Sequence, residues 1–244
     1  MRRTAHIVLA TCLACYLLFY FLSVRSEKKE DTTLCHGVEV VVLDSLKKHF
    51  INQSDIHSLL KREKIDPTGK PMQSLNTEKV EQTLLKNKRI SQVKAYKTPS
   101  GLMGLVVKQR MPVLRVISHT GSYYVDKDGV IMPTSSRFAI KIPLASGSIE
   151  QKLAVGELRD FALFLQEDDF WNSQIEQIFV HPDREVELIP CVGDQRILLG
   201  SLEDYQTKLE NLKLFYEQAM PKVGWEKYKL INLSYKGQVI GVRK

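Results

Sequence analysis

Residues 91–109, SQVKAYKTPSGLMGLVVKQ, decide the fold of the first half of the chain. The segments Ser91–Lys97 and Leu102–Gln109 read as strands, and Thr98-Pro99-Ser100-Gly101 separates them. Proline and glycine in a short connection between two strands are typical of a hairpin loop. The stretch therefore predicts a pair of antiparallel strands.

Three segments upstream of the hairpin complete a small domain. His36–Leu43, HGVEVVVL, is rich in valine and predicts a strand. Two helices are expected next, at Asn52–Lys64, which Asn52 or Ser54 can cap, and from Asn76 to Lys88, which Asn76 can cap. The resulting order of strand, helix, helix, strand and strand predicts a small α+β sheet with both helices on one face.

The chain begins with an apolar stretch, Thr4–Val24, that contains no Asp, Glu, Lys or Arg. A helix of that length is about 31 Å long, close to the thickness of a bilayer's hydrocarbon core. A signal peptide cleaved near Ser23 or Ser26 is the alternative, but the apolar core is long and ends in bulky residues. We expect a retained transmembrane helix. The short tail with Arg2 and Arg3 predicts that the C-terminal part is translocated.

Composition narrows the possible functions. The chain has 35 Lys and Arg against 28 Asp and Glu, with no run of basic residues interleaved with aromatic ones, so we expect no nucleic acid partner. Cys12 and Cys15 fall within the apolar stretch, where their redox-like spacing lacks the βαβ context of a redox motif. The two other cysteines exclude a disulfide-rich fold but leave a Cys35–Cys191 bridge open.

The second half predicts a β-rich domain with packed helices. An amphipathic helix is expected at Glu157–Glu167. A longer helix is expected from Ser201 to Met220, with Ser201 and Asp204 forming a capping box. Strands are expected at 113–118, 122–125, 174–181, 185–190, 195–199, 229–235 and 238–242, with a turn at Lys236-Gly237 between the last two.

The order and spacing of these segments resemble a known family. A β-α-α-β-β module after a membrane segment is similar to a POTRA (polypeptide-transport-associated) domain. Val107–Val113, VKQRMPV, and Tyr124–Ile131, YVDKDGVI, resemble passages of FtsQ/DivIB cell-division proteins, in the style of Bacteroidetes-type FtsQ. The similarity covers nearly the whole chain and continues through Leu188-Ile189-Pro190, Leu199-Gly200, Lys208-Leu209 and Ile231–Tyr235.

We therefore expect an α+β protein with four parts. Residues 1–25 would form a cytoplasmic tip and a single N-terminal transmembrane helix, and residues 26–35 a tether. Residues 36–110 would form the POTRA-like module, and residues 111–244 a mixed β-rich, partner-binding domain.

Motifs for catalysis or metal binding are not recognisable in the sequence. Asp126-Lys127-Asp128-Gly129 lacks the spacing of a calcium-binding EF-hand loop and is interpreted as a hairpin turn. Glu167-Asp168-Asp169 is interpreted as a solvated helix end, and the six histidines are scattered. No P-loop, nucleophile elbow or zinc-protease motif occurs. We expect no enzyme activity, no cofactor, no metal and no small-molecule substrate.

Binding is the function that these observations leave. The predicted strand 238–242 is followed by only two residues, so we expect it to lie at a sheet edge that can accept a partner strand. An ordinary closing hairpin is the alternative. The resemblance implies that FtsB/DivIC–FtsL-type partners dock in this region, and the matching residues are Tyr235, Lys236, Gly237, Val239, Gly241 and Val242.

The resemblance implies a bitopic inner-membrane protein of the division septum, with its C-terminal domains in the periplasm. It would act as a scaffold in control of septal peptidoglycan synthesis. The alternative is a transport or outer-membrane assembly factor with POTRA domains, a class that usually has tandem modules and many barrel strands, and this sequence shows neither.

Overall fold

The computed structural model describes residues 13–20, 33–43, 50–119, 121–135 and 140–244. Residues 13–20 are helical. The predicted transmembrane segment Thr4–Val24 otherwise lies outside the described residues, as does most of the predicted tether. Within the described ranges, no helix has both the length and the apolar character needed to cross a bilayer.

A three-stranded sheet forms the first domain. Its strands β1 (Gly37–Leu43), β2 (Ile90–Lys97) and β3 (Leu102–Gln109) lie in the order β1-β3-β2. The central strand β3 is parallel to β1 and antiparallel to β2. The helices α2 (Gln53–Arg62) and α3 (Thr77–Leu85) share one buried core with the sheet, so the predicted strand-helix-helix-strand-strand order is confirmed.

Both helices begin at the predicted asparagines. The Asn52 side chain accepts a hydrogen bond from the backbone N–H of Asp55, and the Asp55 carboxylate accepts one from the backbone N–H of Asn52. The Asn76 side chain accepts from the N–H of Lys79 in the same way. These bonds satisfy backbone donors that the first helical turn leaves free. A short 3₁₀ helix, η1 (Met72–Ser74), lies between α2 and α3.

A second sheet forms the larger domain, with nine strands in the part of the chain that the structure describes. Their order is β12-β11-β10-β9-β8-β7-β4-β5-β6. The strands are β4 (Pro112–Ser118), β5 (Gly121–Asp126), β6 (Ile131–Pro133), β7 (Leu144–Gly147), β8 (Ile175–Val180), β9 (Val186–Pro190), β10 (Arg196–Gly200), β11 (Tyr228–Asn232) and β12 (Ile240–Arg243).

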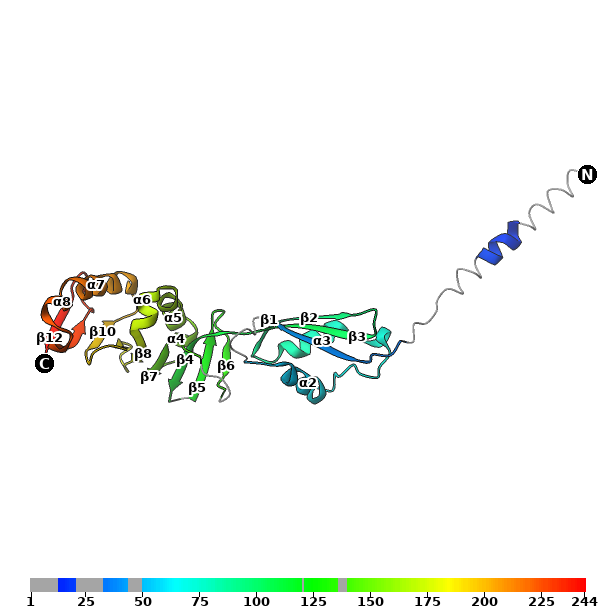
Figure 1. The fold of residues 1–244 in the computed structure, drawn as a ribbon, viewed down its shortest axis with the longest axis horizontal. Coiled ribbons are helices and arrows are strands. Elements are labelled where there is room, and N and C mark those ends of the chain that lie inside the picture. Colours follow the sequence, from blue (N-terminus) through cyan, green and yellow to red (C-terminus); the bar gives the residue numbers. More distant parts are fainter. Residues whose placement is uncertain (1–12, 21–32, 44–49, 120, 136–139) are drawn as a thin grey trace, which may run out of the picture.

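Helices cover one face of this larger sheet, as Figure 1 shows. Apolar side chains of the helices, such as Phe161 and Leu212, share a buried core with strand residues such as Ile178 and Ile197. The opposite face of the sheet is not covered by helices. The covering elements are α4 (Gln151–Val155), α5 (Glu157–Glu167), α6 (Asp169–Gln174), α7 (Tyr205–Gln218) and α8 (Met220–Val223), followed by the 3₁₀ helix η2 (Trp225–Lys227).

The predicted start of the long helix is wrong. The helix α7 begins at Tyr205, and its N-cap Asp204 makes no side-chain capping bond and has φ 52°, in the left-handed region. Gly200, with φ 74°, turns the chain immediately before, so that Ser201 belongs to the turn. The Ser201 carbonyl instead accepts a hydrogen bond of 2.8 Å from the Lys208 ammonium. A capping box between Ser201 and Asp204 therefore does not form.

Other elements differ from the prediction in position or were not predicted. The closing strands are shorter than expected, and the final strand begins at Ile240 rather than at residue 238. The sequence pattern missed β7, α4 and α6 because each is only four to six residues long, too short to show a clear period. The thiols of Cys35 and Cys191 are both free, so the bridge that the sequence left open is not formed.

Polar and apolar contacts join the two domains. The Phe50 ring packs edge-on against Tyr124 at a centroid distance of 5.9 Å and shares a small buried cluster with it. Within the first domain, the Phe50 backbone N–H donates to the Gln109 side chain at 2.8 Å. Across the boundary, the Arg89 guanidinium donates to the Thr134 carbonyl at 3.4 Å. The Arg110 guanidinium, which follows β3, forms an ion pair with Asp126 at the end of β5. The chain thus passes from one sheet to the other through buried polar and apolar contacts.

Asp126 organises the turn that the sequence predicted at 126–129. One carboxylate oxygen accepts hydrogen bonds from the N–H groups of Asp128 and Val130, and the other pairs with Arg110. The side chain of Asp126 is only 2% exposed and that of Arg110 15% exposed. Removing one member of a buried, hydrogen-bonded pair leaves the other charge unpaired, which typically destabilises a protein by about 3–5 kcal/mol.

We therefore predict that Asp126→Ala lowers the free energy of unfolding by about 3 kcal/mol or more. Asp128→Ala is the matched control, because the side chain of Asp128 is 59% exposed and lies 3.4 Å from the same guanidinium. The control should cost less than about 1 kcal/mol, as exposed ion pairs do. Urea unfolding followed by circular dichroism measures both, and equal effects would contradict the importance of the buried pair.

Candidate functional site

The two sheets have four edge strands within the described residues, namely β1, β2, β6 and β12. An edge strand has a row of backbone N–H and C=O groups without a neighbouring strand, and such a row can pair with another chain. Whether other residues contact or block these backbone groups at each edge indicates where a partner strand can bind.

Side chains from the helices occupy both edges of the small sheet. The Gln53 amide, at the start of α2, donates a hydrogen bond of 2.8 Å to the Val40 carbonyl of β1. The Glu81 carboxylate of α3 accepts one of 2.8 Å from the Ala95 N–H of β2. An incoming strand would have to displace these side chains, so each edge is blocked at one backbone group.

The outer edge of the large sheet at β6 is also unsuited to a partner strand. The strand is three residues long, and its last residue, Pro133, has no N–H to donate. A short strand that ends in proline is one way in which proteins protect sheet edges from pairing.

The edge at β12 has outward-facing backbone groups. The Leu233 N–H donates to the Leu198 carbonyl of the neighbouring β10 at 2.8 Å, so the backbone of Leu233 faces β10. Backbone direction alternates along a strand, so Asn232 and Leu230 face β12 instead. Their partners in the antiparallel pair β11–β12 are Ile240 and Val242.

It follows that Ile240 and Val242 bond to β11, whereas Gly241 and Arg243 direct their N–H and C=O groups outward. In the part of the chain that the structure describes, no side chain bonds to the backbone of these two residues. The edge at β12 therefore differs from the edges at β1, β2 and β6.

The two faces of β12 differ in character. Gly241 lies opposite Ile231, a buried core residue, and so faces the helix-covered side. The ring of Tyr228 covers Gly241, and a Cβ atom there would lie 2.5 Å from a ring carbon. The neighbouring side chains, Ile240 and Val242, lie on the uncovered side and are 39% and 38% exposed. A strand added at this edge would place alternate side chains beside these two aliphatic groups.

Lys244 holds the end of β12 in place. Its ammonium lies 3.1 Å from the Asp194 carboxylate and 3.3 Å from that of Glu226. Hydrogen bonds to these two carboxylates raise the pKa of Lys244 above its usual value. The backbone N–H of Lys244 also donates to the Lys227 carbonyl at 3.2 Å. These contacts link the end of β12 to the loop before β10 and to η2.

The structure places the predicted site residues in two groups. Gly241 and Val242 belong to β12, and Val239 precedes the strand and packs against the main core. The other three form the turn, where Gly237 has φ 70°. That turn and the start of α7 line a groove of about 520 Å³, to which Tyr235, Lys236 and Gly237 contribute.

Sequence reasoning did not find the residues that distinguish the edges. Gln53 and Glu81 are ordinary helix-surface residues in the sequence, and only the fold brings them to β1 and β2. Pro133 was a usable signal, because proline is disfavoured inside a sheet. Arg243 lay one residue beyond the predicted end of the final strand.

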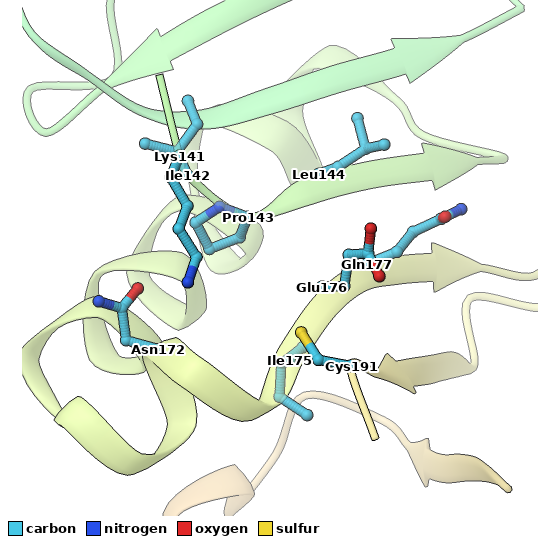
Figure 2. A pocket seen from close by; sticks show the side chains of 9 residues that line it. All are labelled: Lys141, Ile142, Pro143, Leu144, Asn172, Ile175, Glu176, Gln177 and Cys191. Atoms are coloured by element: carbon cyan, nitrogen blue, oxygen red, sulfur yellow. The ribbon is translucent and has the colours of Figure 1, made fainter. Parts of the chain in front are cut away.

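A pocket of about 410 Å³ lies at the ends of β7, β8 and β9. Figure 2 shows Lys141, Asn172, Glu176 and Cys191 around it. The residues lining it include no histidine, and the Cys191 thiol is exposed. Among the described residues, moreover, no cluster of His, Cys, Asp and Glu could hold a metal ion.

Comparisons with known proteins match two regions of the chain. A family model described as FtsQ/DivIB, C-terminal related, matches residues 111–242, which comprise more than half of the chain. A model described as a POTRA-like domain matches residues 33–108. No curated protein matches the chain at a significant level.

The contact between Tyr228 and Gly241 yields a prediction for the edge strand. Gly241→Ala should destabilise the protein by about 1–3 kcal/mol, because the new methyl group overlaps the Tyr228 ring. In a Tyr228→Ala background the same change should cost close to nothing. Urea unfolding of the two single variants and the double variant measures this coupling. Additive effects would show that the ring does not cover Gly241.

Proposed function

The chain belongs to the FtsQ/DivIB, C-terminal related family, and from that premise we propose that it is a non-catalytic scaffold of the cell-division machinery. The scaffold captures a partner by adding a strand of that partner to β12. In this mode, main-chain hydrogen bonds provide affinity and alternate side chains provide selectivity. The partners are single-pass coiled-coil proteins of the FtsB/DivIC and FtsL type.

The contrast between the four sheet edges carries this proposal. Gln53 and Glu81 occupy the edges β1 and β2, and Pro133 ends the short edge β6. At β12, by contrast, no side chain of the described residues bonds to the outward backbone groups of Gly241 and Arg243. The arrangement favours pairing with another chain at one place and disfavours it at the other three.

The site residues of the proposal follow from this geometry. Gly241 and Arg243 supply the main-chain bonds, and the exposed Val242 contacts the partner's side chains. Tyr235, Lys236 and Gly237 form the turn next to the edge, and Val239 leads from the turn into the strand.

We further propose that Thr4–Val24 anchors the protein in the bacterial inner membrane as a single type II span. The charge-free sequence and length of the segment support this proposal. The POTRA-like and β-rich domains would then lie in the periplasm, near the division septum. Anchored partners are confined to the same surface, which raises the effective concentration for docking.

The test of strand addition compares Arg243→Pro with Arg243→Ala. Both remove the side chain, but only proline removes the outward N–H, and it leaves the bonds to β11 intact. Pull-down from envelope extract first identifies the coiled-coil partner. We then expect Arg243→Pro to weaken binding of that partner at least about tenfold more than Arg243→Ala, equivalent to about 1.4 kcal/mol.

Equal affinities of the two variants would contradict strand addition at this edge. Recovery of outer-membrane barrel proteins instead of coiled-coil proteins in the pull-down would contradict the division role. Circular dichroism of both variants controls for the fold.

A further inference from the structure

A cleft of about 370 Å³ lies in the POTRA-like module between the end of α2, the loop 65–76 and the start of α3. Its lining combines an apolar floor, which includes the buried Val80 and Met103, with basic groups at the surface. The basic groups are Lys64, Lys70 and Lys79.

The charged residues that line the cleft are all basic. None of the residues lining it is Asp or Glu, and within the described residues no carboxylate forms an ion pair with the three lysines. The carboxylate of the nearby Asp66 accepts hydrogen bonds from the backbone and hydroxyl of Thr68. These hydrogen bonds, and more weakly Lys61 and Lys70, lower the pKa of Asp66.

The imbalance extends over the whole module. Residues 33–108 contain thirteen Lys and Arg against seven Asp and Glu, whereas residues 111–244 contain sixteen against eighteen. The net charge of the first domain is therefore +6 and that of the second is −2. A strongly positive domain attached to a nearly neutral one favours an anionic partner for the first.

The cleft lies at the end of the module where the chain enters from the N-terminal side. The Met72 N–H donates to the Thr33 carbonyl at 2.9 Å, and the Cys35 N–H donates to the Lys70 carbonyl at 2.9 Å. Eight residues separate Thr33 from Val24, the last residue of the proposed membrane segment. A chain of that length reaches at most about 30 Å, even when fully extended.

We propose that this cleft binds the headgroups of anionic lipids and holds the POTRA-like module against the membrane surface. The lysine ammonium groups would contact the lipid phosphates, and the apolar floor would face the glycerol and the upper acyl chain. Basic groups close to a membrane are attracted electrostatically to anionic lipids. This attraction decreases with distance over about one Debye length. The short connection keeps the cleft within that range. The inference rests on the membrane anchoring proposed above.

The test uses the full chain in nanodiscs made of phosphatidylcholine alone or with one third phosphatidylglycerol. Amide hydrogen exchange is measured across residues 64–79. We expect exchange there to be roughly threefold slower or more in the anionic discs, because bound lipid suppresses local opening. Exchange across residues 157–165, in the other domain, should not depend on the lipid.

Matched variants separate the cleft from general charge. Lys64→Gln, Lys70→Gln and Lys79→Gln combined should abolish the difference between the two kinds of disc. The control combines Lys86→Gln, Lys88→Gln and Lys94→Gln, which removes the same charge from exposed sites of the same module and should preserve the difference. Equal thermal unfolding midpoints of the two variants show that the fold is intact.

Three results would contradict the proposal. Equal exchange rates of residues 64–79 in neutral and anionic discs would exclude lipid binding at the cleft. So would loss of the rate difference between the discs in both the cleft variant and the control variant. If inorganic phosphate in neutral discs slowed exchange of residues 64–79 as much as anionic lipid does, the cleft would be a site for small anions rather than for lipid. Extraction of the chain from membranes by alkaline carbonate would contradict the anchoring itself, whereas retention with equal exchange contradicts only the lipid site.

Discussion

A strand at the edge of a sheet leaves a row of backbone N–H and C=O groups unsatisfied on one side, and both domains of this protein are built around that constraint. In the small sheet, Gln53 and Glu81 reach from the covering helices to β1 and β2. In the large sheet, β6 is protected because it is only three residues long and ends in Pro133. At β12 the outward groups of Gly241 and Arg243 are left available, and the proposed strand addition would satisfy them.

Contacts within the protein hold β12 in an extended conformation that is suited to pairing with another strand. Tyr228 covers Gly241 on the helix side, and Lys244 ties the strand end to Asp194 and Glu226. A preorganised edge loses little conformational freedom on binding, so more of the interaction energy appears as affinity. The buried pair of Arg110 and Asp126 joins the two sheets. The strand β12 and the POTRA-like module lie at opposite ends of one elongated arrangement (Figure 1).

Local patterns in the sequence predicted the elements that depend on local chemistry. The capping asparagines Asn52 and Asn76 and the order of strands and helices in the first domain were correct. The predicted capping box between Ser201 and Asp204 was wrong. Gly200 and Asp204 both have left-handed backbone conformations, which form a turn before the helix. Contacts between distant residues were not predictable, since nothing near Gln53 or Asp126 in the sequence identifies Val40 or Arg110 as its partner.

The measurement that tests the edge account most directly is residue-resolved amide hydrogen exchange of β12, with and without the captured coiled-coil partner. The account predicts that the N–H groups of Gly241 and Arg243, which face outward, exchange much more slowly in the complex. The N–H groups of Ile240 and Val242, already bonded to β11, should change less. Unchanged exchange at Gly241 and Arg243, with new protection at β1 or β2, would contradict it.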